Sequence, residues 1–454
     1  MLDLTPKEIK ERKAITINPS KTCQPVGAMY AALGVHGCMP HSHGSQGCCS
    51  YHRTVLSRHF KEPAIATSSS FSEGACVFGG GSNIKTAVKN IFDMYNPEII
   101  AVHTTCLSET IGDDLKGFID AIDIPEGKYV LHANTPSYVG SHITGFSNMV
   151  TGFIKGLSKT TGVKNGKMCV IPGFVNPGDM REVKRLLKLM GVDFTMLPDT
   201  TGVFDAPMTG KYEMYPKGGT KIQDIIELGD CEKTLALGSF ASEAGAATLE
   251  KSFKIPYSTL KMPIGIGSTD ELIMELSKFS KQQVPYELEE ERGQLVDIMI
   301  DSHPYYDGKK VALYGDPDVL IALSKFLLEL GMIPKYVITG TPSNVFEKQM
   351  QALFDEFGVE GCIAKQDADL FELHQLIKNE SVDLLMGGTH GKYIARAEDI
   401  PLVRIGFPVL DRYVHSYMPN VGYRGAMRLL ELMLGALMDR QDRDVKDEDF
   451  ELVM

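Results

Sequence analysis

The chain has 454 residues, of which 43% are hydrophobic and 23% are charged, a composition typical of a globular protein with more than one core. Its formal net charge of −12 argues against a nucleic-acid partner, because nucleic-acid binders concentrate lysine and arginine to neutralise phosphates. No apolar run reaches the roughly 18 residues that a membrane span needs, and the N-terminus lacks the apolar region of a signal peptide, so we expect a cytoplasmic protein with no membrane partner.

Short apolar runs alternate with helical stretches along the chain, which predicts repeated βα units and buried, mainly parallel sheets. In chain order, the predicted strands are PEIIAVHTT, KYVLHANTP, KMCVIPGF, KTLALGSF, KKVALYGD, PKYVITGT, VDLLMGGTH and LVRIGFPV. Two helices between them, PDVLIALSKFLLELG and PSNVFEKQMQALFDEFG, each end at a glycine, as helices commonly do. Ser268 and Glu271, three residues apart, predict a capping box at the start of another helix.

Two polar stretches, GVKNGK near 162–167 and KQQVPYELEEERG near 281–293, predict breaks between domains. They predict an α/β protein of three domains with doubly wound, mainly parallel sheets. The predicted domains are residues 1–162, 163–287 and 288–454. In such sheets, ligands bind outside the carboxyl ends of the strands.

Polar groups at four turns of the first domain could bind a metal. The chain has nine cysteines, and in the cytoplasm they are expected to be reduced thiols. Cys106 follows the first predicted strand at a strand-to-helix turn, where a helix N-terminus favours the thiolate that binds metals. Ser137 occupies the corresponding turn after KYVLHANTP, while Cys23 lies in the loop KTCQP and Cys48 in HGSQGC. Cluster ligands can converge from such turns, although these long separations match no local ferredoxin-like pattern.

Two other motifs give alternative hypotheses. Cys38, His41, His43 and Cys48 are four possible zinc ligands within eleven residues, which would make the chain a zinc-stabilised α/β binding protein, although they include no C-x-x-C pair. The glycine run at 79–82 could cradle a phosphate, but it lacks the GK[ST] ending of a P-loop.

Longer motifs give the chain a family resemblance. The stretches KTCQPVGAMYAALG, HGSQGC, RHFKEP, VFGGGSNIKTAVKN, TTCLSETIGDDL, NTPSYVGSHITGF and ERGQLVDIMIDSH resemble, in this order, the β-subunits of molybdenum-iron nitrogenase. The resemblance runs from about residue 15 to RIGFPVLDR and GYRGAMRLL near the C-terminus. It implies an oxidoreductase subunit that pairs with an α-subunit in an α2β2 tetramer. It also implies a transient partner, the ATP-hydrolysing iron protein.

In that family the two subunits share the [8Fe-7S] P-cluster, and the resemblance implies that Cys23, Cys48 and Cys106 are its ligands from this chain. Ser137 matches a serine that can bind iron when the cluster is oxidised. Three cysteines leave a four-coordinate iron-sulfur site incomplete, so a second chain must complete it. The cluster relays electrons to the iron-molybdenum cofactor, which lies in the α-subunit and not in this chain, for reduction of N2 to ammonia.

The resemblance also assigns roles outside the cluster. Phe78 matches an exposed aromatic residue at the docking surface for the iron protein; without the resemblance, a buried loop anchor would be the expectation. Tyr51 matches a residue between the P-cluster and the iron-molybdenum cofactor. In the family, a cation site between two β-subunits has hard oxygen ligands that suit Ca²⁺ or iron. The groups that match its ligands here are the carbonyl of Lys61 and the side chains of Glu62, Asp297 and Asp301.

Two features depart from the family pattern. The first ligand cysteine is already residue 23, so contacts of the longer N-terminal arm of many relatives are not transferred. Cys49 is not a general feature, and we expect it to be a spare thiol and not a ligand. The closest alternative is a β-like subunit of the cofactor-assembly scaffold or of a vanadium or iron-only nitrogenase, but Ser45 and Ser137 favour the molybdenum enzyme.

Overall fold

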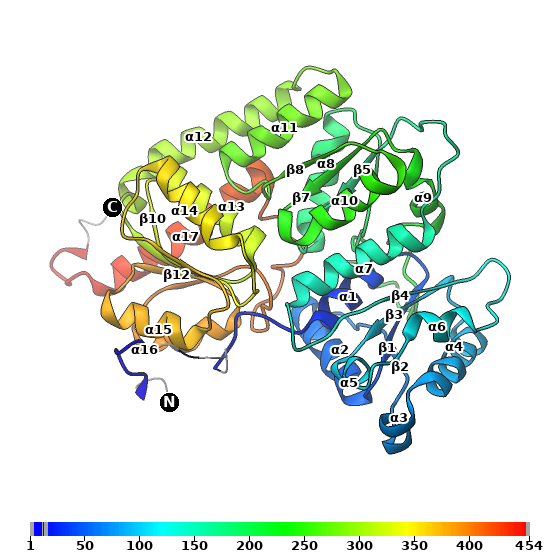
Figure 1. Cartoon of the computed structure of the whole chain (residues 1–454). Coiled ribbons are helices and arrows are strands. Elements are labelled where there is room, and N and C mark those ends of the chain that lie inside the picture. Colours follow the sequence, from blue (N-terminus) through cyan, green and yellow to red (C-terminus); the bar gives the residue numbers. More distant parts are fainter. Residues whose placement is uncertain (1–3, 11, 13–16, 451–454) are drawn as a thin grey trace. The chain divides into compact units, whose positions relative to one another are not determined.

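The computed structural model describes residues 4–10, 12 and 17–450, and it is a mixed α/β fold (Figure 1). The chain forms two compact units. We name them by their place in the sequence: the central unit is Thr22–Leu260, and the terminal unit is Met1–Lys21 with Lys261–Met454.

The first sheet of the central unit has four parallel strands in the order β2-β1-β3-β4. Its strands are β1 (Cys38–His43), β2 (Thr67–Ser68), β3 (Ile99–Thr104) and β4 (Tyr129–Ala133). The helices of this region are α1 (Gln24–Leu33), α2 (Gln46–Phe60), α3 (Glu73–Phe78), α4 (Gly81–Tyr95), α5 (Cys106–Ile111), α6 (Leu115–Asp120) and α7 (His142–Leu157). Every residue of β1 and β3 is buried, so these two strands form the centre of the sheet.

The second sheet of the central unit repeats this topology in the order β6-β5-β7-β8, again with parallel strands. Its strands are β5 (Met168–Ile171), β6 (Phe194–Met196), β7 (Lys233–Leu237) and β8 (Tyr257–Leu260). Its helices are α8 (Pro177–Leu189), α9 (Ile222–Ile226), the 3-10 helix η2 (Glu227–Asp230) and α10 (Ser239–Phe253).

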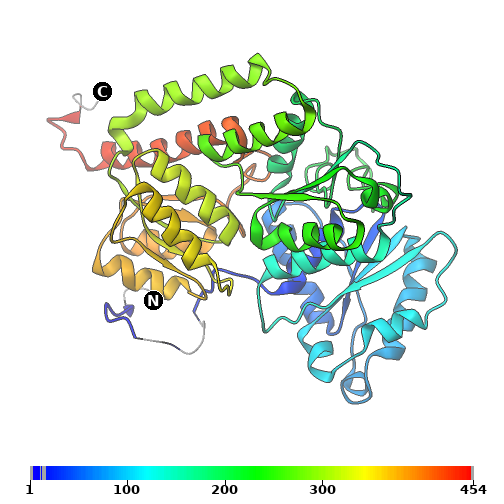
Figure 2. The ribbon, with the colours of Figure 1, turned by 45° about the horizontal axis from the view of Figure 1, so that its top comes forward.

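The terminal unit has a five-stranded parallel sheet in the order β11-β10-β9-β12-β13. Its strands are β9 (Lys310–Tyr314), β10 (Ile333–Ile338), β11 (Ile363–Lys365), β12 (Leu384–Gly387) and β13 (Leu402–Arg404). Its helices are α11 (Ile266–Ser280), α12 (Tyr286–Tyr306), α13 (Pro317–Glu329), α14 (Phe346–Phe357), α15 (Leu370–Asn379), the 3-10 helix η3 (Thr389–Gly391), α16 (Lys392–Ala397) and α17 (Gly422–Asp444). Figure 2 shows α12 and α17 running beside each other in this unit. All three sheets reverse their strand order at a switch point, as doubly wound sheets do, so the predicted fold class is confirmed.

All eight predicted strands are present, but five short or atypical strands were not predicted. The most important is β1, whose sequence CMPHSH contains a proline and no β-branched residue, so its composition argues against a strand. The predicted capping box is wrong, because α11 begins at Ile266 and its first backbone N–H groups donate to Glu329 of α13.

The three-domain division stays a prediction. Each predicted segment contains one sheet, but residue 287 lies in the first turn of α12, and the first two sheets share one compact unit.

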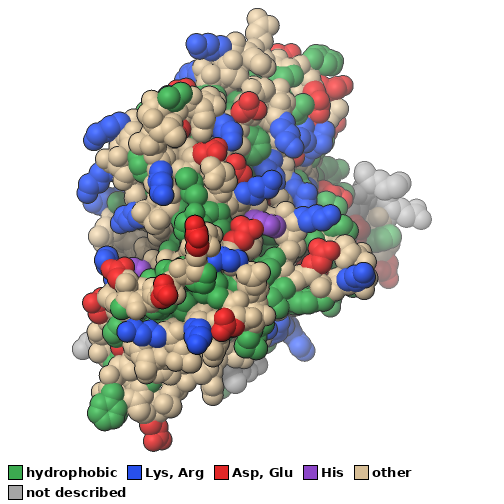
Figure 3. Space-filling model, turned by 90° about the vertical axis from the view of Figure 1, so that its right-hand side faces the viewer, with side chains coloured by type: hydrophobic (Ala, Val, Ile, Leu, Met, Phe, Trp, Pro, Cys, Tyr) green, Lys and Arg blue, Asp and Glu red, His purple; other side chains and the backbone are tan. Residues whose placement is uncertain are grey.

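Within the described part of the chain, no helix is both long and apolar enough to cross a membrane. On the face shown in Figure 3, basic and acidic side chains are interspersed.

Candidate metal centre

Two predicted ligand turns meet at the switch point of the first sheet, between the adjacent strands β1 and β3. Cys48 lies in the first turn of α2, whose N-cap Ser45 accepts a hydrogen bond from the Gly47 N–H at 3.3 Å. Cys106 is the first residue of α5. The two turns touch, because a Cβ added at Gly44 (φ +148°) would lie 1.9 Å from Oγ1 of Thr105. Parallel strands therefore bring Cys48 and Cys106 to the same edge of the sheet.

Cys23 enters from a third direction, as the N-cap of α1. All ten residues of α1 are buried, so this helix is fixed in the core of the central unit. Its Tyr30 ring stacks on Phe60 of α2 at 5.2 Å between ring centroids, and Phe60 stacks on Phe204 at 4.3 Å. This aromatic stack ties the helix that follows Cys23 to the helix that carries Cys48.

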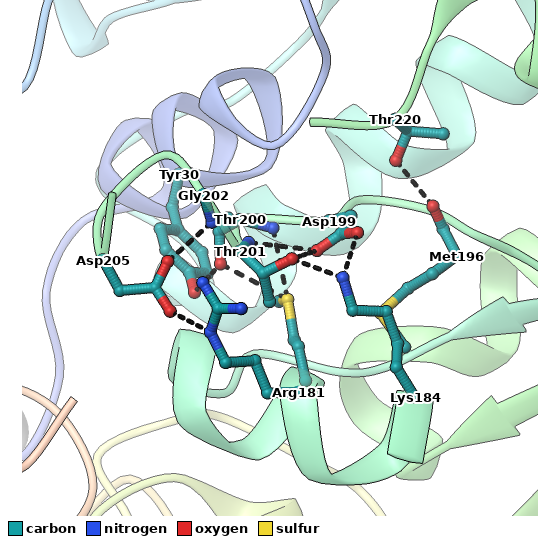
Figure 4. A network of polar contacts seen from close by, with 11 residues as sticks. Tyr30, Arg181, Lys184, Met196, Asp199, Thr200, Thr201, Gly202, Asp205 and Thr220 are labelled. Atoms are coloured by element: carbon teal, nitrogen blue, oxygen red, sulfur yellow. Dashed lines mark hydrogen bonds and ion pairs between the residues drawn. The ribbon is translucent and has the colours of Figure 1, made fainter. Parts of the chain in front are cut away.

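A polar network holds α1 from the side of the second sheet (Figure 4). The Tyr30 hydroxyl shares a hydrogen bond with Thr200 at 2.9 Å. Lys184 of α8 donates to Asp199 at 2.8 Å, and Asp205 accepts from Arg181 of the same helix. The loop after β6 is thereby fixed against both α8 and α1.

The three thiols form one electrostatic group. Burial raises the pKa of Cys23 to about 11, and nearby Cys48 and Cys106 add to that shift. Burial also raises the pKa of Cys48, as do the charge of Cys106 and the hydrogen bond between the two thiols. Such desolvated neighbouring thiols lose their protons readily only beside a compensating positive charge, which bound iron supplies. The donor set of soft sulfur atoms fits an iron-sulfur group.

Ser137 lies in the turn that follows β4, the strand next to β3. Thr135 and Thr104 join this turn to the Cys106 turn by two hydrogen bonds. The Thr135 N–H donates to the Thr104 hydroxyl at 2.6 Å, and the Thr135 hydroxyl donates to the Thr104 carbonyl at 2.7 Å. Ser137 is half-buried. The four predicted turns are thus connected around one edge of the first sheet.

Tyr51 and Phe78 are both exposed. Tyr51 lies one turn after Cys48 and is 50% exposed; the partial burial of this residue raises its pKa, with a contribution from nearby Cys23. Phe78 ends α3, which lies at an outer end of the central unit in Figure 1, and it is 90% exposed. The alternative interpretation of Phe78 as a buried loop anchor is therefore wrong.

The four residues assigned to the cation site fall into two pairs. Lys61 ends α2 in the left-handed conformation with φ 65°, and Glu62 follows it in the wall of a cavity of about 720 Å³. Asp297 and Asp301 are exposed on α12, four residues apart and therefore on one helix face. The two pairs belong to different compact units.

The zinc hypothesis is wrong. Side chains alternate along a strand, so Cys38 lies on the opposite face of β1 from His41 and His43. Both ring nitrogens of His41 are hydrogen-bonded, at 2.9 Å to Thr67 and 2.8 Å to Ser69. His43 is likewise bonded through both nitrogens. Among the described residues, no three histidine, cysteine, aspartate or glutamate side chains are arranged to hold a single metal ion.

The sequence interpretation missed Gln24, which follows Cys23 directly. It is 2% exposed, and it is a strongly polar residue in the otherwise largely apolar helix QPVGAMYAAL. This contrast could have singled out Gln24 in the sequence, because a buried polar side chain needs hydrogen-bond partners.

Comparison with known proteins identifies the family. The family model for nitrogenase component 1 type oxidoreductases matches residues 23–438, so the chain belongs to this family. Within it, the chain belongs with the β chains of the molybdenum-iron protein. It is 64% identical to the nitrogenase molybdenum-iron protein β chain of Clostridium pasteurianum over 100% of both chains, and 42% identical to that of Nostoc sp. over 97% of this chain and 88% of the relative. The solved structure of nitrogenase Cp1 at pH 6.5 superposes with a TM-score of 0.98 at 64% identity, covering 99% of both chains.

Proposed function

We propose that this chain provides three thiolate ligands to the [8Fe-7S] P-cluster and relays electrons through it toward the iron-molybdenum cofactor of an α-subunit. The chain is a subunit of an oxidoreductase, and its family carries the P-cluster at the α–β interface and the second cofactor in the α-subunit. The reaction served is ATP-dependent reduction of N2 to ammonia. The observation that supports the role of this chain is the convergence of Cys23, Cys48 and Cys106 at one switch point.

The proposed ligands have different tasks. The three thiolates would hold iron in every redox state, while Ser137 would bind only when the iron is more oxidised. Its hydroxyl must first release a proton, because the deprotonated oxygen is the harder donor and suits more positive iron. Tyr51, beside Cys23, would lie on the electron path toward the α-subunit.

The proposed partners follow from exposed groups and from the family. The α-subunit completes the cluster in an α2β2 tetramer, and the iron protein docks transiently on the surface that includes Phe78. Lys61, Glu62, Asp297 and Asp301 would bind Ca²⁺ or iron between two β-subunits. We also propose a cytoplasmic location, which suits nine cysteines that form no disulfide.

Replacing one ligand thiol tests the proposal. Cys106→Ala should lower the iron content of the anaerobically purified complex and weaken its subunit association, because the cluster links two chains. The matched control is Cys49→Ala, which removes a buried thiol that donates to the Thr67 carbonyl at 3.5 Å. The control should keep full iron. A Cys106→Ala complex with wild-type iron content and an intact tetramer would refute the assignment.

A further inference from the structure

The side chain of Gln24 bridges two segments that carry proposed cluster ligands. Gln24 is the first residue of α1, immediately after Cys23, and is buried. Its Nε2 donates to the carbonyl of Val139 at 2.9 Å, and its Oε1 accepts from Nδ2 of Asn148 at 3.2 Å. Val139 lies two residues after Ser137. The start of the Cys23 helix is thus bonded to the Ser137 turn.

Asn148 extends the bridge to the other end of the same turn. It lies on α7, and its Nδ2 also donates to the carbonyl of Asn134 at 3.1 Å. The pair of amide side chains therefore holds both Asn134 and Val139, the residues that flank the turn around Ser137. Because both ends of the turn are held, the backbone around Ser137 would need less ordering when the serine binds iron.

Backbone packing leaves this arrangement little freedom. A Cβ at Gly145 of α7 would lie 1.9 Å from the carbonyl oxygen of Gln24, and one at Gly27 of α1 would lie 1.7 Å from the carbonyl oxygen of His142. Gly140, at φ +65°, approaches the Gln24 amide so closely that a Cβ there would lie 3.1 Å from Nε2. The two helices are in direct backbone contact, so the Gln24 amide is held at a fixed place relative to the turn.

We propose that Gln24, together with Asn148, is a positioning residue that preorganises Ser137 for binding to oxidised iron. The inference rests on the proposed role of Ser137 as a redox-dependent ligand. Both polar atoms of the Gln24 amide are already bonded within the bridge, so Gln24 would act through the turn, lowering the entropic cost of ordering it when the serine binds. Loss of the bridge should therefore disfavour the oxidised, serine-bound state and leave the three thiolate ligands in place.

The experiment compares Gln24→Ala and Asn148→Ala in the anaerobic α2β2 complex. The matched control is Gln375→Ala, which removes another buried glutamine whose amide donates to the backbone, at 3.1 Å to Pro6 O. The readouts are iron content and the midpoint potential of cluster oxidation, measured by redox titration at one pH. Both bridge variants should keep full iron. A tenfold weaker serine-bound state raises the midpoint by about 59 mV for a one-electron step, and the control should show no shift.

A double-mutant cycle with Ser137→Ala separates the possible outcomes. If Gln24 acts through Ser137, then Gln24→Ala should shift the potential in the wild-type background and cause no further shift in the Ser137→Ala background. The positioning role would be overturned if Gln24→Ala shifted the midpoint potential equally in both backgrounds. It would also be overturned if Ser137→Ala shifted the potential and Gln24→Ala did not. If Ser137→Ala alone has no effect, the proposed role of Ser137 is what fails. Asn148 is exposed, so its variant keeps the test valid even if Gln24→Ala does not assemble.

Discussion

The backbone contact between α1 and α7 predicts a strong effect for a single added methyl group, in Gly145→Ala. In an ordinary helix this change stabilises by up to about 1 kcal/mol, because alanine has the higher helix propensity. Here the new Cβ would lie 1.9 Å from the Gln24 carbonyl oxygen, whereas ordinary contact begins at 3.4 Å. The helices would have to separate by about 1.5 Å, the difference of these two distances. Overpacking of this kind costs about 1–3 kcal/mol.

The same helix offers a matched control. A Cβ at Gly156 of α7 would make its nearest contact with Leu131 at 3.6 Å, which is ordinary packing, so Gly156→Ala should be neutral or stabilising. Anaerobic urea unfolding at fixed complex concentration should separate the two variants by about 1–4 kcal/mol. The Gly145→Ala complex should also contain less iron, because moving α1 would move Cys23, the proposed ligand at its N-terminus. Equal unfolding midpoints and equal iron contents would show that the helices are not held in contact through Gly145.

Three further predictions concern acid stability, docking and the cation site. Burial lowers the pKa of His41 to about 3 and that of His52 to about 4, from 6.5, so both histidines stay neutral when folded and gain protons on unfolding. The contribution of the neutral histidines to stability is complete above pH 6.5 and is lost as the pH falls toward 4. At pH 5.5 the loss is about 1.4 kcal/mol for each histidine. Urea midpoints that do not fall between pH 7.5 and 5.5 would contradict this. Phe78→Ala should weaken iron-protein docking by about 1–3 kcal/mol at unchanged iron content, so an activity titration that matches the wild type would remove Phe78 from the interface. Replacing Asp297 and Asp301 together by asparagine should empty the proposed cation site and raise the protein concentration at which tetramers dissociate. An unchanged metal content, or unchanged dissociation in ultracentrifugation, would contradict this.

The sequence predicted the regular parts of the fold well and the irregular parts poorly. Most of the eight apolar runs are strands with largely buried residues, such as β3, β5 and β12, and burial on both faces selects valine, isoleucine and leucine. The strand β1 escaped prediction because buried hydrogen bonds, not apolar packing, accommodate its histidines: the hydroxyl of Ser69 is bonded to both His41 and His43. Residue composition does not reveal partners that lie 26 to 28 positions away in the chain.

For the candidate site, the cysteines could be predicted and their supports could not. Cys106 follows from a predicted strand-to-helix turn, Cys48 and Cys23 lie in predicted loops, and the family resemblance assigns all three as ligands. The bridge from Gln24 to Asn148 joins residues 124 positions apart, and it depends on a helix contact that only the folded chain displays. Sequence patterns report which side chains are buried, but they do not report which distant amide a buried amide meets.

The division of the chain into units has a consequence for the order of events during synthesis. The central unit is one continuous stretch, so it can fold once Leu260 has left the ribosome, and it already contains the three cysteines of the proposed metal site. The segment before it, up to Lys21, belongs instead to the unit that contains Lys261–Met454. Arg12 binds both carboxylate oxygens of Asp369, at 2.7 and 2.5 Å, and Thr5 is bonded to His374 at 3.0 Å. Arg12 and Thr5 therefore lack these partners until Asp369 and His374 have also been translated.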